Sequence, residues 1–422
     1  MVVSCNGCNQ SNNTAIISDK TESKTIIQSD VTQTAESRGS QHIAVFSKCT
    51  NYDNSLSAIA SEVRFIPLDN EPPINDFHTT DVALTDDYLF LLSLSHQGII
   101  IYQYDLQGRF IRNIGSRGMG PTEYVNISPP LQIDYQDETI YALDINRRRV
   151  VGYNFNGTFI RAFQANYQGQ MAILDINSIA FRPSTIGEAM FLPNAPFLSF
   201  TDRNGKNEKV YHSHLHPVIS RNEAKNFPNS NPLWEYAGKF YYLEYGADTI
   251  FRISKDEFFP AWTLTGELKP DKKDLFLEDK GRKLSIISLI LRPNSGIFES
   301  HNSLIFRLID NQETFFMVYN KITGQFHRTY ERDAPIWEGR KSSRINRDYF
   351  IDDIVSGLHF NPQYQSMNKA IALIPATKVV EKRDEILRHL NIHPSVESER
   401  LKPIVKKTNE FDNPVVMIVT FK

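Results

Sequence analysis

The chain has 422 residues, of which 41% are hydrophobic and 11% aromatic, so it can bury a large core. Its 46 basic and 49 acidic side chains give a formal charge of −3, which argues against general electrostatic capture of nucleic acid. No run reaches the roughly 18 apolar residues that a membrane-spanning helix needs. Of the three cysteines only Cys49 lies near the part expected to fold, which excludes a disulfide framework within that part.

The first residues resemble the cleavage box of a bacterial lipoprotein, in which a small residue precedes the lipidated cysteine. Residues 2–5 read Val-Val-Ser-Cys, so Cys5 is the predicted lipidation site, whereas Cys8 lacks the apolar residue expected three positions before it. The basic and apolar regions of a signal peptide are missing, so either the true start lies upstream or the match is accidental. We expect residues 1–8 to be the remnant of such a signal and the polar residues 9–56 to be a flexible tether.

A unit of short strands and tight turns recurs through residues 57–422. It is clearest in Ile140–Phe163, where Asn156-Gly157 between two alternating runs gives a strong hairpin signal. A repeated hairpin unit of this length predicts an array of small sheets, which usually forms a β-propeller. We expect an all-β fold of six four-stranded antiparallel blades, although seven short blades would also fit. The other copies are Leu89–Gly115, Ala189–Tyr211, Lys239–Trp262, Ser303–Tyr330 and, weakly, Leu358–Pro375.

The two ends of the expected propeller are predicted to meet in one blade. Glu62–Leu68 and Asn413–Phe421 are both strongly strand-forming, and pairing them would close the ring without an open edge. Between the last repeat and the final strand, Val379–Leu390 places apolar residues near one helical face. This pattern predicts a short surface helix that packs against the rim of a blade.

The loop Gly115–Tyr124 is dense in glycine and follows a predicted strand. A nucleotide-binding loop needs a helix immediately after it, and Pro129-Pro130 leaves no room for one. We therefore predict a connection between blades, whose glycines let the chain cross close to the sheet. In a binding module this loop is the candidate contact to a ligand or partner, through Arg117, Gly118, Gly120, Pro121, Glu123 and Tyr124.

Three alternating histidines are the sharpest chemical feature. On a strand His212, His214 and His216 would share one face, where imidazoles can bind a divalent metal such as zinc or copper. They follow the Asn204-Gly205 turn, which assigns them to an outer strand away from the central channel. The alternative is three neutral imidazoles on a solvated face, and no other cofactor is predicted.

Charged residues elsewhere favour structural roles. Arg147-Arg148-Arg149 is interpreted as solvated loop and rim. Asp144, Glu244 and Asp310 occupy comparable places after the second strand of their repeats, which suggests hydrogen bonds to backbone amides in the loop that follows. The sequence lacks the motifs of serine hydrolases, zinc proteases and P-loop nucleotidases, so the catalytic residues of any activity stay unknown.

The clearest repeat resembles an NHL repeat, and it matches that pattern at Ile140, Asp144, Asn146, Arg149, Tyr153, Gly157 and Phe159. The whole chain is similar to the six-bladed β-propeller lipoproteins common in Bacteroidetes. That similarity rests on a strand like Val63–Leu68, a glycine loop ending in Gly120–Tyr124, and Asp412-Asn413-Pro414 before the last strand. The resemblance implies a fold and an envelope location more than an activity.

Two functions follow as hypotheses. The first is a non-catalytic binding or scaffold lipoprotein of the bacterial cell envelope, at the outer membrane and facing the periplasm or the surface. Its partner would be an envelope protein or glycan, with no nucleic acid, and a lipid anchor would be its only contact with the membrane. The alternative is a lyase or hydrolase, with or without a metal, at the central channel. That site would need side chains from several repeats, such as His78, His96, His301, His327 and His359.

Overall fold

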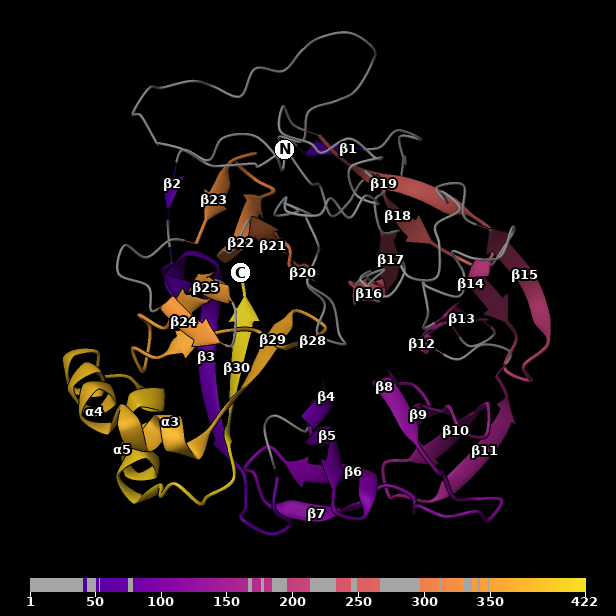
Figure 1. Ribbon diagram of the computed structural model, residues 1–422, viewed down its shortest axis with the longest axis horizontal. Helices are drawn as coiled ribbons and strands as arrows, with labels where there is room; N and C mark the ends of the chain where they lie inside the picture. The colour runs from indigo at the N-terminus through magenta and orange to yellow at the C-terminus, as the bar shows by residue number, and fades with distance from the viewer. Residues whose placement is uncertain are drawn as a thin grey trace, which may run out of the picture.

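The computed structural model describes residues 41–43, 51–52, 54–74, 79–165, 169–175, 178–183, 196–212, 233–243, 249–265, 297–310, 313–329, 336–339, 342–347 and 349–422. Its strands form six antiparallel, four-stranded blades around a central axis (Figure 1). The predicted six-bladed β-propeller is therefore confirmed.

Five blades follow the chain in order, and each begins at its innermost strand. The first contains β4 (Thr79–Leu84), β5 (Tyr88–Ser95), β6 (Gly98–Asp105) and β7 (Phe110–Asn113). The second contains β8 (Ile127–Asp134), β9 (Thr139–Asp144), β10 (Arg149–Asn154) and β11 (Phe159–Gln164), and the third β12 (Gly169–Asp175), β13 (Ser178–Pro183), β14 (Pro196–Thr201) and β15 (Asn207–His212). The fourth contains β16 (Leu233–Tyr236), β17 (Lys239–Leu243), β18 (Thr249–Ile253) and β19 (Phe258–Leu264), and the fifth β20 (Ile297–Glu299), β21 (Ser303–Asp310), β22 (Glu313–Asn320) and β23 (Phe326–Arg328).

The sixth blade joins the two ends of the propeller. It consists of β28 (Tyr364–Ser366), β29 (Lys369–Ile374), β30 (Val415–Phe421) and β3 (Ala60–Pro67), in that order from the inside. β3 pairs antiparallel with β30, with Phe65 opposite Met417, as the sequence predicted. Val63 and Phe65 pack between the fifth and sixth blades, whereas Ile66 packs between the sixth and first. Both faces of β3 are therefore buried, which fixes its register.

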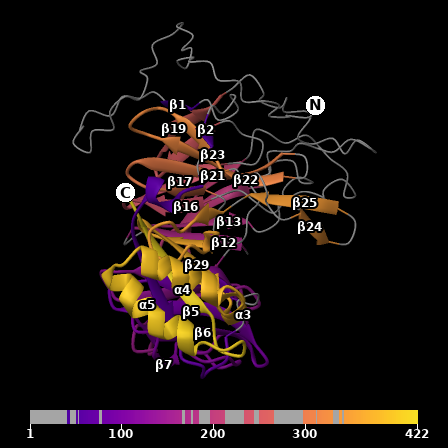
Figure 2. The same ribbon diagram turned by 90° about the vertical axis from the view of Figure 1, so that its left-hand side faces the viewer.

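Three helices lie between β29 and β30 and gather at one side of the propeller (Figure 2). They are α3 (Ala376–Glu381), α4 (Arg383–Ile392) and α5 (Val396–Lys407). The predicted helix is divided between α3 and α4, and its apolar face is confirmed because Val379, Ile386 and Leu390 are buried. α5 was not predicted; it contains Pro403 and is rich in charged residues.

Short additional elements extend the fourth and fifth blades, and others lie apart from the blades. β1 (Gln41–Ile43) runs parallel to β19, and β2 (Asn51–Tyr52) runs parallel to β23. The last part of residues 9–56, the predicted tether, therefore contains two short strands that pair with the fourth and fifth blades. A 3-10 turn (Leu56–Ala58) precedes β3. The hairpin β24 (Ile336–Gly339) and β25 (Ser342–Arg347) extends β22, and β26 (Phe350–Ile351) pairs with β27 (His359–Phe360).

The glycine of the repeated turn is where successive blades meet. In the first three blades this glycine has a positive φ and lies against the last residue of the outermost strand of the preceding blade. At Gly108, with φ +86°, a Cβ would lie only 1.8 Å from a backbone oxygen, so no larger residue fits. The glycine–oxygen pairs are Gly108 with Pro67, Gly157 with Asn113, and Gly205 with Gln164.

Candidate functional site

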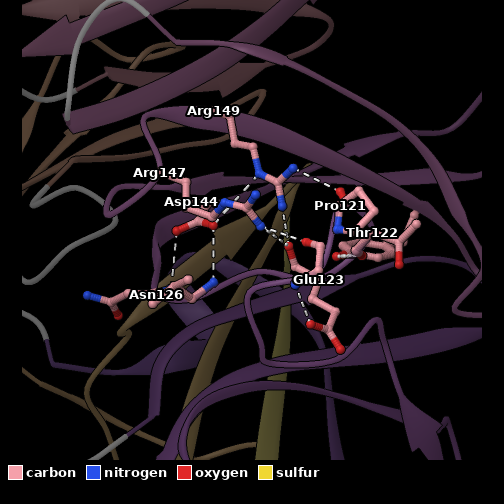
Figure 3. Close-up of polar contacts among 10 residues, drawn as sticks. Pro121, Thr122, Glu123, Asn126, Asp144, Arg147 and Arg149 are labelled. Carbon is pink, nitrogen blue, oxygen red and sulfur yellow. Dashed lines mark hydrogen bonds and ion pairs between the residues drawn. The ribbon is translucent and has the colours of Figure 1, made fainter.

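The predicted ligand loop, Gly115–Tyr124, connects β7 of the first blade to β8 of the second, as expected of an inter-blade connection. In antiparallel blades this connection lies at the same end of the propeller as the β5–β6 and β9–β10 turns. A hydrogen bond from Arg117 Nη1 to the carbonyl oxygen of Gln97, 2.5 Å long, ties the loop to the first of these turns. Figure 3 shows the contacts that hold it to the second.

Arg147 of the β9–β10 turn and Arg149 at the start of β10 hold the loop through its carbonyl oxygens (Figure 3). Arg147 Nη1 donates to Gly120 O at 2.6 Å, and Arg149 Nη1 donates to Pro121 O at 2.9 Å. Arg149 Nη2 also donates to Glu123 O. The interpretation of the arginine triplet as solvated is correct for Arg148, which is exposed, and wrong for the other two. Alternation sends Arg147 and Arg149 to the same side, where the loop lies.

Asp144, the last residue of β9, supports this arrangement. Its side chain is fully buried, and its oxygens accept hydrogen bonds from the backbone amides of Val125, at 3.1 Å, and Asn126, at 3.2 Å. The same carboxylate lies 3.9 Å from Arg149 Nε. The predicted role in binding backbone amides is confirmed. The predicted loop was wrong, because the amides precede β8 and the end of β9 lies beside the start of β8.

The two related carboxylates, Glu244 and the side chain of Asp310, lie outside the described part of the structure. Burial and the neighbouring Arg147 lower the pKa of Arg149 from its ordinary value. An arginine remains charged at neutral pH even so. The loop is therefore held by a permanent cation whose charge is partly balanced by buried Asp144.

Within the loop most polar groups are used internally. The Gly120 amide donates to Glu123 Oε2 at 2.6 Å, and the Gly118 amide donates to Tyr124 O at 2.8 Å. A Cβ on Gly118 would lie 2.0 Å from Glu123 Oε2, so a larger residue here would displace the Glu123 carboxylate. Tyr153 Oη donates to Thr122 O at 2.7 Å. These bonds give the loop a defined shape.

The residues that the loop exposes to solvent differ from those predicted to contact a ligand or partner. The ring of Tyr124 is 1% exposed, and burial raises its pKa to about 12, so this side chain does not face a partner. Arg117 and Pro121 are exposed. The most prominent residue is Met119, 76% exposed, which sequence reasoning missed. A single apolar residue between two glycines of a polar loop was the signal that could have identified it.

The predicted metal and lipidation sites lie largely outside the described residues. His212 is the last residue of β15, the outermost strand of the third blade, so its predicted outer position is confirmed. His214, His216 and Cys5 fall outside the described ranges. Within those ranges no three His, Cys, Asp or Glu side chains come together as a metal site would require.

Polar side chains on the innermost strands join neighbouring blades. Asp81 on β4 accepts a hydrogen bond from the amide of Leu131 on β8 at 2.6 Å. Glu299 on β20 forms an ion pair with Lys321, at 2.8 Å, and accepts a hydrogen bond from Trp234 Nε1 on β16 at 2.9 Å. All of these side chains are buried, so these contacts fix the blades relative to one another.

The four described histidines among those considered for a channel site do not come together. His96 lies in the β5–β6 turn and His301 in the β20–β21 turn, and these two kinds of turn are at opposite ends of antiparallel blades. His327 lies on the outermost strand β23, and His359 lies on β27. His78 is outside the described residues.

Comparison with known proteins supports the fold. A crystal structure of a protein assigned as exported from Bacteroides fragilis NCTC 9343 is similar, with a TM-score of 0.60 and 16% identity over 88% of this chain and 98% of that one. A member of the DUF4221 family from Bacteroides vulgatus ATCC 8482 is 12% identical over 86% of this chain and 97% of that one, with a TM-score of 0.44. At 16% identity, the similarity to the Bacteroides fragilis protein shows the fold alone.

No protein with a curated description matches this sequence. None of the helices in the described ranges is long and apolar enough to span a membrane. One family model, "Domain of unknown function (DUF4934)", matches residues 40–420. Because this match covers nearly the whole chain, including every blade, the protein belongs to the DUF4934 family.

Proposed function

We propose that this protein is a non-catalytic binding module, lipid-anchored in the bacterial cell envelope, and that the loop Gly115–Tyr124 contacts its partner. The observation that carries this proposal is that the loop is held by Arg147 and Arg149 while Met119 projects from it into solvent. A loop ordered before binding loses little conformational entropy when it binds. Its internal bonds therefore favour recognition of a partner.

The chemistry of the exposed surface favours a protein partner over a glycan. Met119 is flexible and polarizable, and methionine is enriched at protein interfaces. Arg117 and Pro121 lie beside it in the loop and are also exposed. An apolar patch on the envelope partner would cover Met119, with polar groups around it.

The test replaces Met119 with a photo-crosslinking amino acid in the full-length protein, expressed in its own cell. Ile322, in the turn between β22 and β23, is 52% exposed and serves as the matched apolar control. The proposal expects one discrete adduct at position 119 that is absent at position 322. The same adducts at both positions, or none at position 119, would overturn it.

A second variant tests whether the ordered shape of the loop matters. Glu123→Ala removes the acceptor of the Gly120 amide but leaves Met119 in place. We expect the yield of the adduct to fall severalfold while the melting temperature changes by only a few degrees, because about one hydrogen bond is lost. An unchanged yield would show that a fixed loop shape is not required.

The lipid anchor is tested separately. Growth with an alkyne-labelled fatty acid is expected to label the full-length protein, and Cys5→Ser is expected to abolish the label and release the protein from the membrane fraction. Cys8→Ser is the matched control and should retain both. Label that persists in Cys5→Ser would overturn anchoring at this residue.

A further inference from the structure

A groove lies on the outer edge of the sixth blade, beside the first blade. It has a volume of about 330 Å³ and is lined by Arg64 and Pro67 of β3, Gln107 of the β6–β7 turn, and Arg400 and Ile404 of α5. This volume is at the lower end of the range for small-molecule sites. The groove therefore has room for a ligand of about one sugar ring.

Arg64 supplies the first cation of the groove. Its Nη2 donates to the carbonyl oxygen of Leu106 at 2.9 Å. Its Nε is buried and makes no hydrogen bond within the described part of the chain. A guanidinium has five N–H donors, so this side chain is held in place while most of its donor capacity is unused.

Arg400 supplies the second cation and is positioned by the edge of β3. Its Nη2 donates to Phe65 O at 2.9 Å, and its Nη1 donates to Glu397 Oε2 at 3.2 Å. Glu397 Oε1 in turn accepts from the Phe65 amide at 2.7 Å. Together Glu397 and Arg400 cover the free backbone groups of an edge strand. The Arg400 side chain is nonetheless 36% exposed, so it can still reach a ligand.

The charges of these groups favour an anion. Two guanidinium groups line the groove, and the carboxylates beside its lining residues are already bonded: Glu397 to Phe65 and Arg400, and Asp105 to Arg109. The planar donor fork of arginine matches the geometry of carboxylate, phosphate and sulfate oxygens. Pro67 and Ile404 add apolar walls that suit the C–H face of a small ring.

We propose that this groove binds a small ligand through an oxyanion, a carboxylate, phosphate or sulfate group carried on a body about the size of one sugar ring. Arg64 and Arg400 hold the oxyanion, and Pro67 and Ile404 contact the body. The site is independent of the loop Gly115–Tyr124, so the two proposals stand or fall separately.

Titration calorimetry on the full chain tests the proposal with three probes that share a sugar ring: glucuronate, glucose 6-phosphate and neutral glucose. We expect saturable binding of at least one anionic probe and none of glucose. Glucuronate alone would identify a carboxylate ligand, and glucose 6-phosphate alone a phosphate ligand. Arg64→Gln and Arg400→Gln should each weaken binding about tenfold or more, because each removes a charge-assisted contact. The absence of saturable binding by both anions would overturn the proposal.

Glu397→Gln tests whether Glu397 and Arg400 affect ligand binding or only the stability of the fold. The amide oxygen can still accept from Phe65 N, but the negative charge beside the groove is removed. We expect anion affinity to rise severalfold in this variant, with a melting temperature close to that of the parent. If Arg64→Gln and Glu397→Gln both leave anion affinity unchanged, the groove is not the binding site.

Discussion

Asp81 on β4 is buried and accepts a hydrogen bond from the backbone amide of Leu131 on β8. The bond joins the innermost strands of the first two blades, whose connection is the loop Gly115–Tyr124. Burial raises the pKa of Asp81 from 3.8 to about 7, while its hydrogen bonds from the amides of Leu131 and Val82 oppose the shift. A carboxylate at the junction of two blades is therefore protonated in the folded protein at mildly acidic pH.

The free energy of unfolding is expected to depend on pH through Asp81. Because the folded state binds the proton more tightly than the unfolded state, the contribution is fully present below pH 4 and is lost as pH rises towards 7. Its size is about 4 kcal/mol at most. Asp81→Asn keeps an acceptor for Leu131 without the titration, so it should match the parent near pH 4 and exceed it at pH 8. Urea unfolding of both proteins between pH 4 and pH 8 measures this difference. If the free energy of unfolding depended on pH in the same way in both, Asp81 would not be the group responsible.

The glycine turns should differ in their tolerance of a side chain. Gly108 and Gly324 both have positive φ, but a Cβ at Gly108 would lie 1.8 Å from Pro67 O, whereas nothing lies within 4 Å at Gly324. Gly324→Ala should lower the free energy of unfolding by about 1 kcal/mol through backbone strain alone. Gly108→Ala should cost about 3 kcal/mol or more, because the two blades must also separate. Equal losses in thermal or urea unfolding would show that the close approach does not matter.

Arg149 and Arg148 should also differ in how much each contributes to the free energy of unfolding. Arg149→Met leaves Pro121 O without its donor, leaves Glu123 O with only the longer bond from Arg147, and removes the cation near Asp144, so we expect a loss of about 2–3 kcal/mol. Arg148→Met is the control, since that side chain is exposed, and should change stability by less than about 0.5 kcal/mol. Urea unfolding measures both, and a similar loss in the two variants would contradict the proposed clamp.

Substitutions at Lys321 and Glu299 should have coupled effects on the free energy of unfolding. Burial lowers the pKa of Lys321, although the attraction of Glu299 opposes that shift. Lys321→Met alone would leave a buried carboxylate without its cation and should cost about 3–5 kcal/mol. Glu299→Gln with Lys321→Met should recover much of this loss, because the amide oxygen can still accept from Trp234. A double-mutant cycle measures the coupling, and simple additivity would show that the pair is not coupled.

Several features of the fold could be predicted from local patterns. The pairing of β3 with β30 followed from two strongly strand-forming segments at the ends of the repeats. The fourth blade could be predicted although Lys255-Asp256 stands where other repeats have a glycine turn, because the flanking strands still alternate. In the structure the Asp256 carbonyl oxygen accepts a hydrogen bond from Lys209 Nζ at 2.9 Å. The helix α5 was missed because its buried positions, Leu401 and Val405, are too few among charged residues to signal an apolar face.

The candidate sites were less predictable. Residue spacing identified the loop Gly115–Tyr124 but could not show that Tyr124 faces inward and Met119 outward. The groove had no sequence signal at all, since Arg64 and Arg400 lie at opposite ends of the chain and meet only because the last blade closes the ring.

By itself the sequence determined the repeat, its strands and its turns, because backbone sterics and side-chain alternation act over a few residues. Only the tertiary structure decided which polar groups are buried and which partner each one finds. Arg149 reaches Glu123 O, and Asp81 reaches Leu131 N, across a boundary between blades or strands that no spacing records. Such contacts depend on how the blades stack, and their burial gives them the strength to fix the loop and the innermost strands.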